Sequence, residues 1–228
     1  MIVLGADGCR GGGWVVAVVD GEGELSWAWA DDTSGVLELA DDLDADAVAL
    51  DVPIGLPALG GRRRCDDLAR TRLGPRRSSV FAAPPRDVLL CRSYAEARPI
   101  APTLSAQAFA LVPRIREVDD ALRARGPAVH DVIVECHPEV SFATAAAAAT
   151  WEMRLAPKKT AAGALQRLSL LDDAFSAGVP VDVQPGAALD DALDAAACAV
   201  TAHRWVSGNA EVLGDEVDAL GVPMRIVV

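Results

Sequence analysis

The chain has 228 residues, of which 51% are hydrophobic, enough to bury one large apolar core without disulfides, although two small domains are not excluded. Its formal net charge of −12 argues against broad electrostatic binding to nucleic acid, because phosphate contacts draw on a surplus of lysine and arginine. Any basic face that meets nucleic acid must therefore be local.

The cysteines and the N-terminal residues indicate a reduced, cytoplasmic protein. The five cysteines are odd in number, and no pair has C-x-x-C spacing, so neither a disulfide framework nor a zinc knuckle is indicated. Asp7 and Arg10 interrupt any signal-peptide core, and no apolar run reaches the roughly 18 residues of a membrane helix. We expect no membrane segment, and the sequence leaves the oligomeric state open, a homodimer included.

The first fifty residues predict a β-meander, a short helix and a buried strand. Apolar segments separated by glycine-rich and acidic turns predict three consecutive strands, at 2–7, 13–19 and 24–30. Thr33 or Ser34 is expected to cap a helix that ends near Leu43. The apolar run AVALDV that follows is typical of a strand covered on both faces.

A stretch rich in proline and arginine, at about 54–130, resembles an insertion laid over the core. It predicts one helix at 65–73, stopped by Gly74, and another at 105–125, which Pro113 is expected to kink or divide. The buried stripe of the second helix is expected to consist of Leu111, Ile115, Val118 and Leu122.

The rest of the chain predicts a further buried strand at 131–136 and a closing edge strand in MRIVV. Between these strands, three helices are expected, at about 141–152, 158–177 and 190–206. The order of elements is that of the ribonuclease-H-like fold, an α/β class with a mixed sheet flanked by helices. We expect a single domain of this class over 1–228.

Four acidic residues occupy positions where such a fold presents functional groups. Asp7, Asp51 and Glu135 end buried strands, and Asp194 lies on a helix. Strand ends of an open α/β sheet meet at one edge, which predicts a shared cleft. Carboxylate oxygens favour Mg²⁺ or Mn²⁺, and two such ions roughly 4 Å apart perform phosphodiester displacement. The pattern predicts a two-metal phosphodiester hydrolase in which these four acids are the catalytic residues and metal ligands.

Each strand-end acid also has a structural explanation. Asp7 could cap a backbone amide in a turn, and Asp51 could belong to a proline-bounded turn. Glu135 could pair with an arginine from 62–86. A zinc site at Cys136 and His137 is not favoured, because neighbouring strand residues point to opposite faces and the sequence offers no second Cys/His pair.

The last predicted helix begins with three acids. Asp191 and Asp194 are three residues apart and share one face, which makes both candidate metal ligands, with Asp194 preferred. Asp190 and Asp191 could instead complement the helix dipole. Glu139, which follows a proline, is expected to cap the next helix, at about 141–152.

Several segments together resemble the predicted ribonuclease-H-like nuclease family known as domain-of-unknown-function family 429. They are GADGCRGGGWVVA, DVPIGLP, RRCDDLARTRLGPRRSSVFAAP, SAQAFALVPRIREVD, ECHPEVSFA, KKTAAGALQRLSLL and DDALDAAACAVTA. The resemblance implies a mixed sheet with helices on both faces and nuclease activity. It also implies that Asp7 bridges two metals, and that Asp194 lies in a D-x-x-D-A pattern like that of Holliday-junction resolvases.

Candidate substrate contacts are basic or hydroxyl-bearing. Lys158 and Lys159, the only lysines, open a predicted helix, where they and the backbone amides could hold a phosphate, although they could also be only a solvated helix start. The family motifs add Arg10, Arg77 and Ser78. The arginines within 62–86 could form a local nucleic-acid face or simply pair with nearby acids.

Two other function classes remain open. A non-catalytic module that binds nucleic acid or protein would gain support if the four acids proved far apart. An actin-like nucleotide binder would need a second phosphate-binding hairpin and a duplicated domain, which the sequence does not show. The sequence does not distinguish RNA, DNA, a junction or a small phosphoester as substrate.

Overall fold

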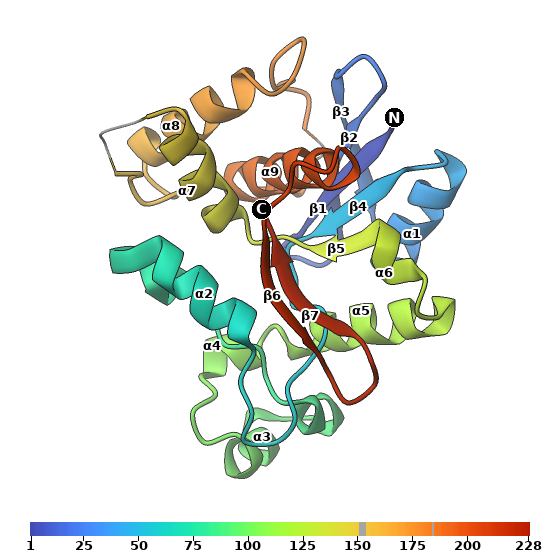
Figure 1. The fold of residues 1–228 in the computed structure, drawn as a ribbon, viewed down its shortest axis with the longest axis vertical. Coiled ribbons are helices and arrows are strands. Elements are labelled where there is room, and N and C mark those ends of the chain that lie inside the picture. The colour runs from blue at the N-terminus through green and yellow to red at the C-terminus, as the bar shows by residue number, and fades with distance from the viewer. Residues whose placement is uncertain (151–153, 184) are drawn as a thin grey trace. The chain divides into compact units, whose positions relative to one another are not determined.

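A computed structural model describes residues 1–150, 154–183 and 185–228 of the protein (Figure 1). The chain divides into two compact units. The first consists of Met1–Asp51, Val132–Glu211 and Val227–Val228. The second consists of Val52–Asp131 and Val212–Ile226. The insertion expected at about 54–130 falls within the second unit.

A five-stranded mixed sheet with the strand order β3-β2-β1-β4-β5 forms the core of the first unit. The first three strands are an antiparallel meander, and β4 and β5 run parallel to β1. The strands are β1 (Val3–Gly8), β2 (Trp14–Val19), β3 (Leu25–Ala30), β4 (Ala47–Leu50) and β5 (Ile133–Glu135). The expected meander and buried fourth strand are confirmed, and the fold is of the ribonuclease-H-like α/β class.

The register of the sheet brings two predicted acids to one edge. Asp7 lies opposite Val15 near the end of β1, and the parallel pairing sets Ala6 beside Leu50. The backbone N–H of Asp51 then donates to the carbonyl of Ala6 at 3.0 Å. Asp51 therefore leaves β4 at the level where Asp7 ends β1.

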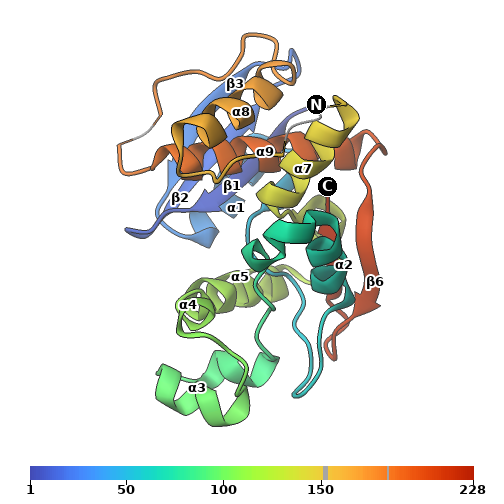
Figure 2. The same ribbon diagram turned by 90° about the vertical axis from the view of Figure 1, so that its left-hand side faces the viewer.

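Four helices accompany this sheet: α1 (Thr33–Asp42), α7 (Pro138–Ala148), α8 (Ala161–Asp172) and α9 (Leu189–Val206). Helix α9 packs along β1, β2 and β4, and α7 and α8 pack against α9 (Figure 2). Gly5 permits the close approach, because a Cβ there would lie 2.0 Å from the Ala199 nitrogen and 2.2 Å from the Ala195 oxygen. The alanine-rich face of α9 thus rests directly on the β1 backbone.

Some boundaries in the first unit differ from the expectation. The N-cap of α1 is Asp32, which accepts from the Gly35 N–H at 2.9 Å, so neither Thr33 nor Ser34 caps the helix. An aspartate in this extended position binds the free amide as well as a hydroxyl residue does. The strand expected at 131–136 is shorter, since the short helix α6 (Val129–Val132) precedes β5.

The helix expected at 141–152 begins at Pro138, because proline suits the first helical turn. The last two residues of that expectation, 151 and 152, lie outside the described residues. The helix expected at 158–177 is confined to Ala161–Asp172. Thr160 caps it through the Gly163 N–H, so the two lysines precede the helix and are not part of it.

The second unit contains helices and a two-stranded sheet. Its elements are α2 (Arg64–Leu73), the 3-10 helices η1 (Gly74–Ser79) and η2 (Arg86–Leu90), α3 (Tyr94–Ile100), α4 (Ala106–Phe109), α5 (Val112–Arg125), β6 (Val212–Val217) and β7 (Pro223–Val227). The C-terminal strand is confirmed, but its partner β6 was not expected, because its exposed, acidic sequence hides the strand pattern.

The helix expected at 105–125 is divided, and Pro113 lies in the first turn of α5. Leu111 is 39% exposed, and Val112 takes its place in the buried stripe with Ile115, Val118 and Leu122. The buried position moves from Leu111 to Val112 because the helix is interrupted between α4 and α5, so the helical periodicity starts again at α5.

All five cysteines are buried free thiols. Among the helices of the described ranges, none combines the length and the apolarity that a membrane crossing requires.

Replacing Gly5 by alanine is expected to destabilise the protein by about 3 kcal/mol, because the new methyl group would overlap the backbone of α9. Urea unfolding measures the loss. The matched control is Gly11→Ala, where a Cβ meets no atom of the described residues within 4 Å. Equal unfolding free energies for the two variants would contradict the close packing of α9 on β1.

Candidate metal centre

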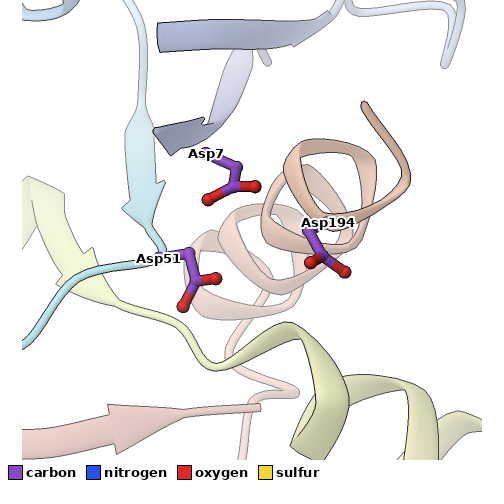
Figure 3. A group of neighbouring side chains, drawn as sticks. All are labelled: Asp7, Asp51 and Asp194. Atoms are coloured by element: carbon purple, nitrogen blue, oxygen red, sulfur yellow. The ribbon is translucent and has the colours of Figure 1, made fainter. Parts of the chain in front are cut away.

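Three of the predicted acids converge at the end of the sheet (Figure 3). Asp7 lies near the end of β1, Asp51 directly follows β4, and Asp194 projects from the N-terminal part of α9. One carboxylate oxygen from each residue lies within 4.8 Å of the other two. Asp7 and Asp194 are 8% and 1% exposed, whereas Asp51 is half-buried. The group is therefore mostly withdrawn from water, with Asp51 at its open side.

The local sequence explains why these residues meet. The parallel pairing of β1 and β4 aligns the strand ends that carry Asp7 and Asp51. The contact of Gly5 with Ala195 fixes the height of α9 on the sheet. Asp194 precedes Ala195 in the helix, so the same contact delivers its carboxylate to the strand ends.

Burial and mutual repulsion disturb the ionisation of the group. Burial raises the pKa of Asp7 well above its ordinary value, and the charges of Asp51 and Asp194 raise it further. Burial also raises the pKa of Asp194 to about 7, against the attraction of Lys158 and with the added repulsion of Asp51. The three carboxylates therefore favour either protons or a cation between them.

One oxygen of the group has no hydrogen-bond partner. Within the described residues, Asp194 Oδ1 is buried and makes no hydrogen bond, while Oδ2 accepts from Lys158. A buried unsatisfied carboxylate oxygen is costly unless something fills its lone pairs. Oxygens from three aspartates are the donor set that Mg²⁺ and Mn²⁺ prefer, so the residues present fit a hard divalent cation.

Lys158 is the nearest cation to this group. Its Nζ donates to Asp194 Oδ2 and lies 3.9 Å from Asp190 Oδ2. Burial alone would lower the pKa of Lys158, but the attraction of Asp194, Asp7 and Asp51 outweighs burial and raises it. The sequence predicted a phosphate contact for Lys158 and did not reveal this pairing. Its only signal was the rarity of lysine, since the partners lie 36 residues apart in the chain.

Two predicted ligands lie outside the three-carboxylate group of the described residues. Glu135 is buried at the end of β5, beside Leu50, but it does not belong to the group. Asp191 Oδ2 accepts from the Ala188 N–H at 3.2 Å, which is the helix-terminus role left open by the sequence. Glu139 does not cap α7 as expected; it forms a buried ion pair with Arg167.

The remaining candidates are exposed. Arg10 lies in the turn between β1 and β2, and Lys159 is exposed beside Lys158. Arg77 and Ser78 line a hollow of about 530 Å³ within the second unit.

Many arginines of 62–86 are paired with carboxylates inside the second unit. Arg63 binds Asp66 at 2.5 Å, with both side chains buried, and Arg86 contacts Asp119 and Asp218 at 2.6 and 2.5 Å. Further ion pairs involve Arg62, Arg64 and Arg70. These contacts favour the interpretation that the arginine-rich stretch serves local structure.

Comparison with known proteins gives one result. The family model described as "Protein of unknown function (DUF429)" matches residues 5–219. The matched range contains all three carboxylates and Lys158. No curated protein and no solved structure matches the chain significantly.

In the metal-free protein at pH 8, Asp7→Asn is expected to raise the midpoint of thermal unfolding by about 2 to 4 °C, equivalent to about 1 kcal/mol. A carboxyl group whose pKa is raised by folding destabilises the folded state once it is charged. The gain should therefore shrink as the pH falls and vanish below the ordinary aspartate pKa of about 3.9, where Asp7 is protonated in both states.

Calorimetry in the presence of a chelator measures this effect, with the exposed Asp120→Asn on α5 as the control. A lower midpoint for Asp7→Asn than for the control at pH 8 would show that Asp7 stabilises the fold and is not repelled by its neighbours.

Proposed function

The chain belongs to the DUF429 family of proteins of unknown function, and we propose that it is a metal-dependent phosphodiester hydrolase, a nuclease of the ribonuclease-H-like class. The metal ligands are Asp7, Asp51 and Asp194, and the metal is Mg²⁺ or Mn²⁺. The buried free thiols of the five cysteines support a reducing, cytoplasmic setting for this activity.

One observation carries the proposal. Carboxylates from three separate elements converge within 4.8 Å, and the most buried of them keeps an oxygen without a hydrogen-bond partner among the described residues. A chain selected only for stability would replace such a group by neutral side chains, because each buried negative charge increases the free energy needed to keep the neighbouring carboxylates ionised. Function is the simplest reason to retain it.

The geometry assigns a part to each residue. Asp194 is held almost fully buried by α9 and supplies an oxygen from the closed side of the group. Asp51 is the half-buried member of the group, so we assign it the side from which substrate would enter. Asp7 lies within 4.8 Å of both, so it can share a cation with either neighbour. When bound, divalent ions supply the Lewis-acid chemistry of phosphodiester hydrolysis.

The charge of the site defines the substrate class. Three carboxylates repel an anionic phosphodiester, so substrate binding must follow or accompany the entry of a cation. The overall charge of −12 adds to this repulsion. The proposal therefore predicts a substrate bound mainly through the metal centre, with few contacts to the phosphate backbone and a weak dependence of affinity on salt.

A non-catalytic binding module is the second candidate, and a specific contact favours it. Lys158 already neutralises part of the acidic group through Asp194. If the ammonium group is the permanent partner of these carboxylates, the site needs no metal. Metal binding by the wild-type protein separates the two candidates.

Calorimetric titration with Mn²⁺ at pH 8 is expected to show binding that Asp7→Asn, Asp51→Asn and Asp194→Asn each weaken by at least about 10-fold. Removing a metal ligand should weaken metal affinity at least as much as removing a residue that only hydrogen-bonds to a ligand, which typically costs about 10-fold or more. Asp120→Asn, an exposed carboxylate in the second unit, should bind as the wild type does. Wild-type protein that binds no Mn²⁺ at millimolar concentration would favour the non-catalytic module.

The same four variants should then be assayed for cleavage of single-stranded, duplex and branched nucleic acids and of a chromogenic phosphodiester. We expect activity only with Mg²⁺ or Mn²⁺, and a loss of at least about 100-fold in each ligand variant. Cleavage that persists at the wild-type rate in all three ligand variants would place the chemistry elsewhere.

A further inference from the structure

We propose that Lys158 is the resident cation of this centre, which occupies Asp194 in the metal-free protein and must leave it before a divalent ion can bind. The inference rests on the proposed function and adds its regulation: the chain itself competes with the metal. Lys158 thereby sets the metal concentration at which the site fills.

The position of the ammonium group suits a competitor. Nζ donates to Asp194 Oδ2, one of two oxygens on the most buried carboxylate of the group. Asp190 Oδ2, at 3.9 Å, offers the ammonium a second partner outside the three-carboxylate group. The Lys158 side chain is 32% exposed, so it borders solvent at the edge of the group. It can leave Asp194 without crossing the core.

The backbone that carries Lys158 is fixed. The N–H and the hydroxyl group of Thr160 donate to the carbonyl of Pro157 at 2.9 and 2.8 Å. Gly163 packs so closely that a Cβ there would lie 2.1 Å from the same carbonyl. The segment before α8 is thus held against the first turn of that helix, and Lys158 departs by rotating its side chain.

A buried arginine fastens this segment to the neighbouring helix. Arg167 is fully buried and donates to Glu139 Oε1 at 3.0 and 2.6 Å. The same guanidinium group donates to the carbonyls of Ala156 at 3.1 Å and Gly163 at 2.7 Å. A buried ion pair costs desolvation energy, so its satisfaction by four hydrogen bonds indicates a fixed arrangement. It joins α7, α8 and the segment that ends at Lys158.

Charge then decides the exchange. One ammonium group leaves three carboxylates with excess negative charge, so a divalent ion is still attracted. When the ammonium turns toward Asp190 or solvent, the ion takes its place on Asp194 and then repels the ammonium from returning. Lys158 consequently lowers the affinity of the site for metal, and in the metal-free protein it reduces the repulsion among the three carboxylates.

The test is Mn²⁺ titration by calorimetry of the wild type, Lys158→Met and the matched control Lys159→Met, whose side chain is exposed beside it. The titration is run at pH 8.5, so that protons do not replace the missing ammonium. Lys158→Met is expected to bind Mn²⁺ at least about 10-fold more tightly than the wild type, because the competing charge is gone. Lys159→Met should match the wild type.

A charge-preserving variant separates the effect of the lost charge from the effect of any other change at this position. Lys158→Arg keeps a cation near Asp194, so it should bind Mn²⁺ with less than about 3-fold gain over the wild type. Circular dichroism establishes that each variant is folded before titration. A gain of equal size in Lys158→Arg and Lys158→Met would overturn the role assigned to the charge.

The outcomes separate the two proposals. Equal or weaker Mn²⁺ binding by folded Lys158→Met overturns the resident cation and leaves the metal centre standing. Binding by Lys158→Met alone, with none by the wild type at millimolar Mn²⁺, supports the resident cation but counts against metal-dependent activity of the wild type. Absence of binding in every variant overturns both the metal centre and the inference built on it.

Discussion

The contact between α9 and β1 at Gly5 is the constraint on which the site depends. Since Gly5 has no side chain, the helix backbone reaches the strand backbone, with the Ala195 oxygen and Ala199 nitrogen at the position a Cβ would need. The contact fixes the height and rotation of α9 on the sheet. Asp194 therefore reaches the strand ends that carry Asp7 and Asp51, and a small shift of the helix would separate the three carboxylates.

The acidic group opposes the stability that this packing provides. Burial and like charge raise the pKa of Asp7 and of Asp194, so the folded chain holds these groups charged only at a cost. Lys158 offsets part of the cost at Asp194, and the Arg167 network fixes the segment from which it reaches. The α9–β1 packing, the Lys158 ammonium and the three carboxylates thus depend on one another, and the carboxylates lower the stability of the fold while they attract a cation.

The sequence predicted the parts of this system that depend on local pattern. Buried apolar runs located β1 and β4, so the acids that end them, Asp7 and Asp51, could be identified. Position along α9 favoured Asp194 but kept Asp191 as a second candidate ligand; in the structure Asp194 belongs to the group and Asp191 accepts from the Ala188 N–H. The pairing of Lys158 with Asp194 also escaped prediction, because it depends on how α8 docks and no local pattern encodes that contact.

The central claim is that Asp7, Asp51 and Asp194 together bind a divalent cation. Anomalous diffraction at the manganese edge, from crystals soaked in Mn²⁺, tests it most directly. We expect a peak roughly 2.0 to 2.6 Å from oxygens of all three carboxylates, the range of hard-cation contacts, with the Lys158 ammonium moved off Asp194. Soaked crystals that show no peak there, with Lys158 still bound to Asp194, would contradict it.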